Sequence, residues 1–351
     1  MEFVVPNKMI IQADFTEVVE YIHQARQKAY TQINTTLIEL YWNIGRIISQ
    51  KVKSSNWGKG VVSELASFIT QNDSTVKGFS DKNLWRMKQF YEIYHDDEKL
   101  SPLVRELPWT HNTIIFSRSK TTEEREFYLR LTIKEKYTKR ELERQIDTSL
   151  YERTILGNQK LSAVLRELHP MIDNTFKDSY VLEFLGLPTQ HNESHLQKAL
   201  IANMKQFILE LGGDFIFIGE EYRLQVGNSD FFIDLLFFHR GLSALVAFEL
   251  KSEKFKPEHL GQINFYLEAL DRDVKKQHEN PSIGVLLCRD KDDEVVEYAM
   301  SRHLSPTLVS HYTTMLPDKK ILQIKLHEIT EILESQNEQE FNNFRMEQNN
   351  V

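Results

Sequence analysis

Three charged residues interrupt two strongly apolar runs in the stretch IDLLFFHRGLSALVAFELK (residues 233–251): Asp234, Glu249 and Lys251. The runs have the length and composition of β-strands, and the glycine in the break between them favours a hairpin. A charged side chain inside a buried strand is unfavourable unless it is paired or takes part in chemistry. These three residues are therefore the first candidates for a functional site.

The hairpin predicts which side chains meet. A two-residue turn at Gly241 and Leu242, of type II′ because glycine comes first, places Asp234 opposite Glu249. Lys251 then shares the side of Glu249, because side chains alternate along a strand. The opposite side of the strand pair is expected to be wholly apolar; it comprises Ile233, Leu235, Phe237, Val246, Phe248 and Leu250.

Two facing carboxylates repel each other, and partial burial strengthens the repulsion. A folded protein can relieve it by sharing a proton, by using Lys251 as a counter-ion, or by binding a divalent cation. Carboxylate oxygens suit Mg²⁺ or Mn²⁺, and such an ion polarises a phosphodiester and lowers the pKa of its bound water. A nearby ammonium can stabilise the developing charge. The cluster therefore indicates phosphodiester hydrolysis, while a buried charge cluster without a catalytic role is the alternative.

The elements that must position this cluster follow from the apolar periodicity. Residues 14 to about 153 have apolar positions three and four apart, which predicts helices, with a break at WGKG (57–60) and a loop at LPWTHN (107–112). Helix starts are indicated by an N-cap at Ser80 and by capping boxes at Thr121 with Glu124 and Thr138 with Glu141.

The period changes after Gly157-Asn158. A helix, three strands, a second helix and a fourth strand follow one another, which is the pattern of an α/β domain. The predicted bounds are 193–211 for the first helix, 214–226, 231–240 and 243–251 for the strands, 257–270 for the second helix and 282–288 for the last strand. A further helix is predicted at 159–168, and the tail from 331 is polar and acidic.

Composition narrows the class of protein. The 351 residues suffice for two domains, and the net charge of -8 means that any nucleic-acid binding must use local basic patches. Residues 51–90 form such a patch, with Lys51, Lys53, Lys59, Lys77, Lys82, Arg86 and Lys88 against three acidic residues, Glu64, Asp73 and Asp81.

Four residues of this patch are candidates for nucleic-acid contacts. Lys82, Arg86 and Lys88 lie on the helix that follows Ser80, which is either a recognition helix or an ordinary amphipathic helix. Lys59 lies between two glycines, which allow a close approach to phosphate or simply form a tight turn.

Membrane insertion and secretion are not expected. No apolar run approaches the roughly 20 residues that a membrane-spanning helix needs, and the N-terminus lacks the features of a signal peptide. The single cysteine, Cys288, ends an apolar run and is interpreted as a core thiol. We therefore expect a cytoplasmic protein.

The order of elements, with aspartate on the second strand and Glu-x-Lys on the third, resembles the PD-(D/E)xK nuclease superfamily. Over a longer stretch, the chain resembles the YhcG family of bacterial proteins. The matching segments run in order from about residue 40 to 300; they are LYWNIGRII, WGKG, GFSDKNLWRMKQFYE, LPWTHN, LYERT, FLGLP, EEYRLQVGNSDFFIDLLFFHR, FELKSEKFKPEHLGQINFYLEAL and NPSIGVLLC.

The resemblance implies an α+β two-domain protein. An all-helical N-terminal domain (1–156), expected to bind DNA and to dimerise, precedes a restriction-endonuclease-like α/β core of order αβββαβ (157–330), and the polar acidic tail spans 331–351. Asp234 and Glu249 match the metal-binding carboxylates, and Lys251 matches the catalytic lysine. Ile233 stands where the superfamily name has a proline, a frequent relaxation.

Three more residues are carried over from the resemblance. Gln262 and Tyr266, four apart on the second helix, match a Q-x3-Y motif that can hold substrate phosphate or the lysine. Glu193 matches a position where related nucleases place an additional metal-binding acid. Since a glutamate in a first helical turn is also favoured by the helix dipole, both interpretations of Glu193 stay open.

We therefore expect a Mg²⁺- or Mn²⁺-dependent endonuclease that acts on duplex or branched DNA in restriction, defence or DNA processing. A homodimer would supply the two active sites that two cuts on a duplex require, and restriction-modification or defence proteins are candidate partners. The alternatives are a catalytically silent subunit that binds nucleic acid or protein, and a nuclease that cleaves RNA.

Two other sets of residues have side chains that could bind a metal ion. His191 and His195 are four apart, a spacing that suits zinc on one helical face, but no second pair of ligands lies nearby, so a solvated helix start is preferred. Glu220 and Glu221 could approach the metal; edge or turn positions are preferred for both.

Overall fold

The computed structural model describes residues 8–54, 57–169, 172, 175–188 and 190–329, with the backbone alone for 8–14. It divides into two compact units, Met1–Glu143 and Arg144–Val351. The predicted boundary after residue 156 stays a prediction, and the predicted tail at 331–351 lies outside the described residues. In the part of the chain that the structure describes, no helix has both the length and the apolar character needed to cross a membrane.

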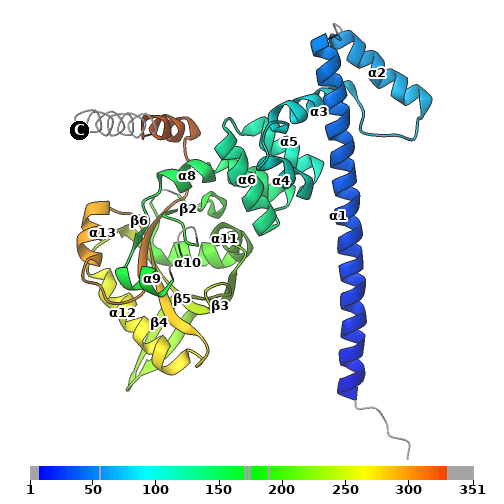
Figure 1. The fold of residues 1–351 in the computed structure, drawn as a ribbon. Coiled ribbons are helices and arrows are strands. Elements are labelled where there is room, and N and C mark those ends of the chain that lie inside the picture. Colours follow the sequence, from blue (N-terminus) through cyan, green and yellow to red (C-terminus); the bar gives the residue numbers. More distant parts are fainter. Residues whose placement is uncertain (1–7, 55–56, 170–171, 173–174, 189, 330–351) are drawn as a thin grey trace, which may run out of the picture. The chain divides into compact units, whose positions relative to one another are not determined.

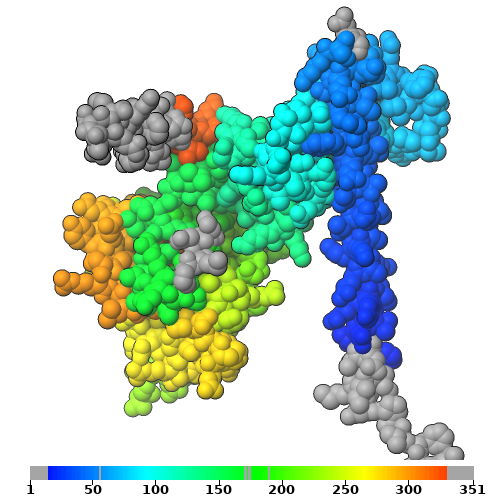
Figure 2. Space-filling view, viewed as in Figure 1, coloured from blue at the N-terminus to red at the C-terminus, as the bar shows by residue number. Residues whose placement is uncertain are grey.

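The first unit is helical, as predicted (Figure 1). Its longest element is α1, and the N-terminal part of α1 extends beyond the other helices of this unit (Figures 1 and 2). The helices are α1 (Lys8–Ser54), α2 (Lys59–Asn72), α3 (Asp81–Tyr94), α4 (Leu100–Glu106), α5 (Trp109–Arg118), α6 (Thr122–Glu135) and the start of α7 (Lys139–Asp147).

Glycine allows α1 and α3 to pack closely. Tyr41 and Ile48 of α1 are buried with Leu84 and Met87 of α3. A Cβ atom at Gly45 would lie 2.1 Å from the carbonyl oxygen of Met87, so no larger residue fits there without moving the helices apart. This contact fixes the C-terminal half of α1 in the unit.

The predicted helix starts are confirmed. The Ser80 side chain accepts a hydrogen bond from the backbone N–H of Asn83. Thr121 Oγ1 accepts one from the N–H of Glu124 at 3.1 Å. At Thr138 the capping box is reciprocal: Glu141 N–H donates to Thr138 Oγ1 at 3.4 Å, and Thr138 N–H donates to Glu141 Oε2 at 2.7 Å.

The predicted loop at 107–112 is wrong in its second half, because α5 begins at Trp109. The carbonyl of Pro108 accepts hydrogen bonds from the N–H groups of His111 and Asn112, which starts the helix. The buried side chain of Asn112 also donates to the carbonyl of Leu107 at 3.0 Å. A side chain from the next helix thus satisfies the end of the preceding one, which the local pattern did not reveal.

The second unit is a seven-stranded mixed sheet with helices on both faces (Figure 1). Its elements are α8 (Leu150–Leu156), β1 (Lys160–Leu161), α9 (Ala163–Leu168), β2 (Ser179–Val181), η1 (Glu183–Leu185), α10 (Glu193–Ala202), α11 (Met204–Leu211), β3 (Phe215–Val226), β4 (Ser229–His239), β5 (Ala244–Lys254), α12 (His259–Ala269), η2 (Leu270–Val274), β6 (Asn280–Asp290), α13 (Asp293–Met300) and β7 (Thr307–Thr313).

The sheet contains the predicted αβββαβ core. The strand order is β1-β7-β6-β5-β4-β3, with β2 beside β7. Strands β3, β4 and β5 are antiparallel neighbours, whereas β5, β6 and β7 run parallel. The prediction missed β1, β2 and β7, and it joined α10 and α11 into one helix, although Asn203 ends the first and starts the second.

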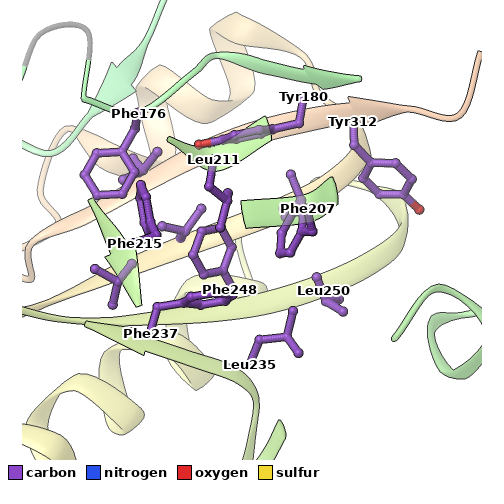
Figure 3. Packing of buried hydrophobic residues seen from close by; sticks show 14 of the residues in the cluster. Phe176, Tyr180, Phe207, Leu211, Phe215, Leu235, Phe237, Phe248, Leu250 and Tyr312 are labelled. Carbon is purple, nitrogen blue, oxygen red and sulfur yellow. The ribbon is translucent and has the colours of Figure 1, made fainter. Parts of the chain in front are cut away.

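Two apolar layers hold the sheet between helices. Leu196 and Leu200 of α10 and Phe207 of α11 pack with Phe237 and Phe248 of the sheet, as the close-up in Figure 3 shows for the aromatic residues. On the other face, residues of α12 and α13 form a second layer, which includes Leu260, Ile263, Val296 and Met300. The continuous apolar runs of the central strands follow from burial on both faces.

The predicted register of the β4–β5 hairpin is confirmed where the strands pair, with Leu236 opposite Ala247 and Leu235 opposite Phe248. The predicted turn type is wrong. The loop comprises the four residues between His239 and Ala244, and its left-handed residue is Ser243 (φ 48°) rather than Gly241. A four-residue loop around the same centre preserves the register, which is why the pairing was still predicted correctly.

The prediction for Ile233 is also wrong. Five of the six residues of the predicted apolar side pack with α10 and α11, whereas Ile233 packs in the layer beneath α12. Since Ile233 and Leu235 face opposite layers, the strict alternation of side chains breaks at the residue between them, Asp234.

Candidate active site

The candidate site begins where the β4–β5 ladder ends. Leu235 and Phe248 are the paired residues farthest from the hairpin turn. The next residue on each strand in that direction is Asp234 on β4 and Glu249 on β5. Instead of continuing the ladder, the Asp234 side chain reaches across to β5, where its Oδ2 accepts a hydrogen bond from the N–H of Leu250 at 2.8 Å. Asp234 is thereby held beside β5.

Lys251 links the predicted carboxylates. Its Nζ donates to Glu249 Oε1 at 2.8 Å and lies 4.0 Å from Glu193 Oε2 at the start of α10. The Glu249 and Lys251 side chains are only 3% and 12% exposed, whereas that of Glu193 is 47% exposed. The buried Glu249 and Lys251 therefore form an ion pair, and Glu193 lies at its solvent-exposed side.

Helix α12 supplies the predicted amide and phenol. Lys251 Nζ donates to Gln262 Oε1 at 3.5 Å, and Gln262 Nε2 donates to the hydroxyl oxygen of Tyr266 at 2.9 Å. The bond to the buried Tyr266 orients the amide so that its oxygen faces the lysine. The structure thus brings together all six residues predicted for catalysis and metal binding.

Burial and repulsion perturb the carboxylates. Burial, together with the nearby charge of Asp234, raises the pKa of Glu249 to about 7 despite its bond to Lys251. Burial also raises the pKa of Asp234, although the Leu250 N–H and Lys251 favour its charged form. Burial lowers the pKa of Lys251, but the bond to Glu249 outweighs this and the net shift is upward. The lysine therefore remains charged at neutral pH, while the carboxylates lack sufficient counter-charge.

Glu221 belongs to this site more closely than the sequence suggested. It lies on the edge strand β3 between Glu220, which pairs with Leu235, and Tyr222, which pairs with Ile233. Its φ of 43° is left-handed, and its charge raises the pKa of Asp234. The preference for an edge position was correct. The left-handed backbone conformation at Glu221 depends on tertiary structure.

Comparisons with known proteins identify the family of this chain. Residues 17–153 match the DUF1016 N-terminal domain, and residues 173–327 match the YhcG PDDEXK nuclease domain. The Escherichia coli (strain K12) protein named "Putative nuclease YhcG" is 32% identical over 355 residues, covering 90% of this chain and 94% of that protein. The chain belongs to the YhcG family. Its second unit is accordingly a PDDEXK nuclease domain, the enzyme class that hydrolyses phosphodiester bonds.

Two solved structures share a smaller part of this YhcG-family chain. One is a repair endonuclease from Pyrococcus abyssi (14% identity, 37% of this chain and 50% of that chain, TM-score 0.24). The other is a complex of EndoMS with double-stranded DNA (17% identity, 34% of this chain and 45% of that chain, TM-score 0.22).

PDDEXK nucleases generally use divalent metals, and the residues present here fit such an ion. Glu249 Oε2 is buried without a hydrogen-bond partner, and both Asp234 and Glu249 offer oxygen ligands. Among the described residues, no group of three or more His, Cys, Asp or Glu side chains is arranged to hold a metal.

The residues predicted to bind nucleic acid occupy the first unit. Lys59, Lys82 and Arg86 are exposed at the starts of α2 and α3. Lys88 differs from them, because its Nζ lies 2.6 Å from Glu92 Oε2 and 5.8 Å from the centre of the Trp85 ring. Lys88 is therefore largely engaged within its own helix.

The histidine pair does not form a zinc site. His191 precedes α10, which begins at Glu193, so it does not share a helical face with His195. The two ring nitrogens of His191 lie 2.9 Å from the carbonyl oxygen of Pro188 and 2.8 Å from the hydroxyl of Tyr312. The interpretation as a helix start is supported, with His191 tied to β7.

Proposed function

We propose that this protein is a metal-dependent endonuclease that hydrolyses the phosphodiester bonds of DNA, in restriction, defence or DNA processing. The observation that carries the proposal is the unpartnered, buried Glu249 Oε2, beside Asp234 and within an ion pair to Lys251. A buried carboxylate oxygen without a hydrogen bond destabilises the folded protein. A cation of the kind that PDDEXK nucleases use would satisfy both carboxylates.

A divalent ion held by Asp234 and Glu249 would polarise the phosphodiester and lower the pKa of a bound water molecule. Lys251 stays protonated beside Glu249, so its ammonium can donate to the phosphate oxygen that gains charge during attack. Gln262 also accepts a hydrogen bond from the lysine, and Tyr266 fixes the amide. Burial raises the pKa of the Tyr266 phenol, which therefore keeps its proton.

The exposed cations Lys59, Lys82 and Arg86 of the first unit support a nucleic-acid substrate, because phosphate contacts provide most of the non-specific affinity for DNA. The hydrolytic chemistry does not select the sugar, so RNA is tested beside DNA. Two copies of the chain would provide the two sites that cleavage of both strands requires.

The test compares wild type with Lys251→Gln, which removes the ammonium and keeps a polar side chain. The matched control is Lys254→Gln, at the exposed end of the same strand. Each protein is incubated with duplex DNA, branched DNA, single-stranded DNA and RNA, with Mg²⁺ or Mn²⁺ and with EDTA. We expect cleavage of DNA by wild type and control, no cleavage in EDTA, and a loss of about 10²-fold or more for Lys251→Gln.

Cleavage of RNA alone would assign the activity to the other nucleic acid. Binding of DNA without cleavage by the wild-type protein in either metal would replace the proposed enzyme with the catalytically silent subunit.

A further inference from the structure

The side chains in the first part of α1 are not covered by the other described residues of its unit. Every side chain from Phe15 to Ile33 is exposed, and Asn34 is the first residue that is partly buried. The Asn34 Nδ2 donates to the carbonyl oxygen of Arg105 at 3.3 Å, which marks the beginning of the packed half of the helix. Roughly five turns of α1 therefore project from the helical unit. Figure 2 shows them as the dark blue segment.

One side of this projecting part is apolar. Phe15, Val18, Ile22 and Ile33 are exposed by 64%, 56%, 50% and 66%. Their spacing of three, four and eleven residues places them on one side of the helix, with Ala25 and Ala29 between them. The same stripe continues along the packed half through Leu37 and Leu40, which are 36% and 44% exposed.

The stripe is centred on a different side of α1 from the face that packs in the unit, and Leu37 lies where the two sides meet. The buried residues of α1 include Ile38, Tyr41, Gly45, Ile48 and Ser49, and the centre of this face is rotated by roughly a third of a turn from the centre of the stripe. Their contacts with α3 therefore hold the helix without using its second apolar side. An exposed apolar side on a helix whose other side is already packed marks an interaction surface.

The apolar residues are arranged symmetrically about the middle of the stripe. When two copies of α1 run antiparallel around the point between Gln27 and Lys28, Phe15 lies opposite Leu40, Val18 opposite Leu37, and Ile22 opposite Ile33. Nearer the centre, the small Ala25 lies opposite the large Tyr30. The six large residues of the stripe thus each meet an apolar partner.

We propose that the stripe Phe15–Leu40 binds the same stripe of a second copy of this chain, as an antiparallel helix pair with two-fold symmetry. Such an interface is isologous and closes on itself, which a self-complementary pattern requires. Pairing over this length, roughly 40 Å, would bury on the order of 1,000 Å², where specific interfaces begin.

One charged residue lies within the stripe and constrains the arrangement. Arg26 faces Ala29 of the other helix, which leaves space for its long side chain to reach water. In a parallel, in-register pair the two Arg26 side chains would instead lie directly opposite each other, which is unfavourable. Arg26 therefore favours the antiparallel arrangement.

Sedimentation equilibrium of the full chain tests the interface without reference to nuclease activity. We expect a dimer for wild type, and a shift of at least tenfold in the dissociation constant for Ile22→Glu combined with Ile33→Glu. The control, Gln24→Glu, places the same acid on the opposite side of the exposed helix and should leave the dimer intact. A wild-type monomer at tens of micromolar, or a dimer unaffected by the double change, would overturn the proposal.

Disulfide cross-linking tests the orientation. Ile22→Cys and Ile33→Cys are made separately, and the native Cys288 does not interfere because it is buried. Mixing the two variants under mild oxidation should give a cross-linked dimer that joins one of each, with little product from either variant alone. Efficient cross-linking of each variant with itself would show a parallel pair and contradict the proposed arrangement.

Discussion

The N–H of Leu250 donates a 2.8 Å hydrogen bond to Asp234 Oδ2, at the point where β4 and β5 cease to pair. The bond replaces a main-chain ladder contact with a side-chain contact. It gives Asp234 a structural role beside its role as a candidate metal ligand, and the two roles can be separated by substitution.

Asp234→Asn should abolish cleavage while keeping the fold, because an amide oxygen still accepts from Leu250 N–H but binds a cation poorly. Asp234→Ala should also abolish cleavage and, in addition, lower the free energy of unfolding by about 1–3 kcal/mol, since it leaves a buried N–H without an acceptor. Urea denaturation of both variants checks this difference. Equal stability of the two variants would contradict the structural role of the bond.

Stability without metal should fall as the pH rises. The folded protein binds the Glu249 proton more tightly than the unfolded chain does, because the pKa of this carboxyl rises from 4.5 to about 7 on folding. The favourable contribution is complete below pH 4.5 and is lost as the pH passes about 7. We expect a loss of about 1–3 kcal/mol across this window, measured by denaturation in EDTA.

Glu249→Gln provides the comparison for that measurement. The amide carries no charge at any pH, so this variant should show a flatter stability profile and exceed wild type at pH 8. Asp234 shifts in the same direction and retains part of the pH dependence. If stability changes with pH in the same way for wild type and Glu249→Gln, folding does not raise the pKa of Glu249.

Adding metal should offset the repulsion between the buried carboxylates and so increase the free energy of unfolding. Mn²⁺ at about 100 times its dissociation constant should raise the free energy of unfolding by about 2–3 kcal/mol, because the ion binds only the folded site. The combined change Asp234→Asn and Glu249→Gln should remove this effect. Glu253→Gln, an exposed acid on the same strand, is the control and should retain it. Thermal unfolding with and without Mn²⁺ measures all three proteins.

The basic residues of α3 should differ in their effect on DNA binding. Lys82→Ala and Arg86→Ala remove exposed charges, so each should weaken binding several-fold and reduce the slope of affinity against salt by about one. Lys88→Ala removes a cation already paired with Glu92, so its effect should be smaller. Fluorescence anisotropy over a range of salt concentrations makes the comparison. A larger effect of Lys88→Ala would show that α3 contacts DNA through its other side.

Much of the site could be predicted because it lies within a continuous stretch. Asp234, Glu249 and Lys251 are joined by one hairpin, and a register centred on its turn is enough to bring them together. Gln262 and Tyr266 follow on the next helix and were added through the family resemblance. Glu221 could not be included with confidence from the sequence, because its left-handed backbone conformation is a property of the β3–β4 pair.

The sequence by itself determined the two-part organisation, the central strands and their register, since apolar periodicity and charge placement are local properties of the chain. Only the tertiary structure decided that the ladder ends at Asp234, that Ile233 faces the layer beneath α12, and that Glu249 Oε2 is buried without a partner. These features depend on how distant elements pack on both faces of the sheet. The same holds for α1, because the sequence predicts a helix there while the fold determines which of its apolar side chains remain exposed.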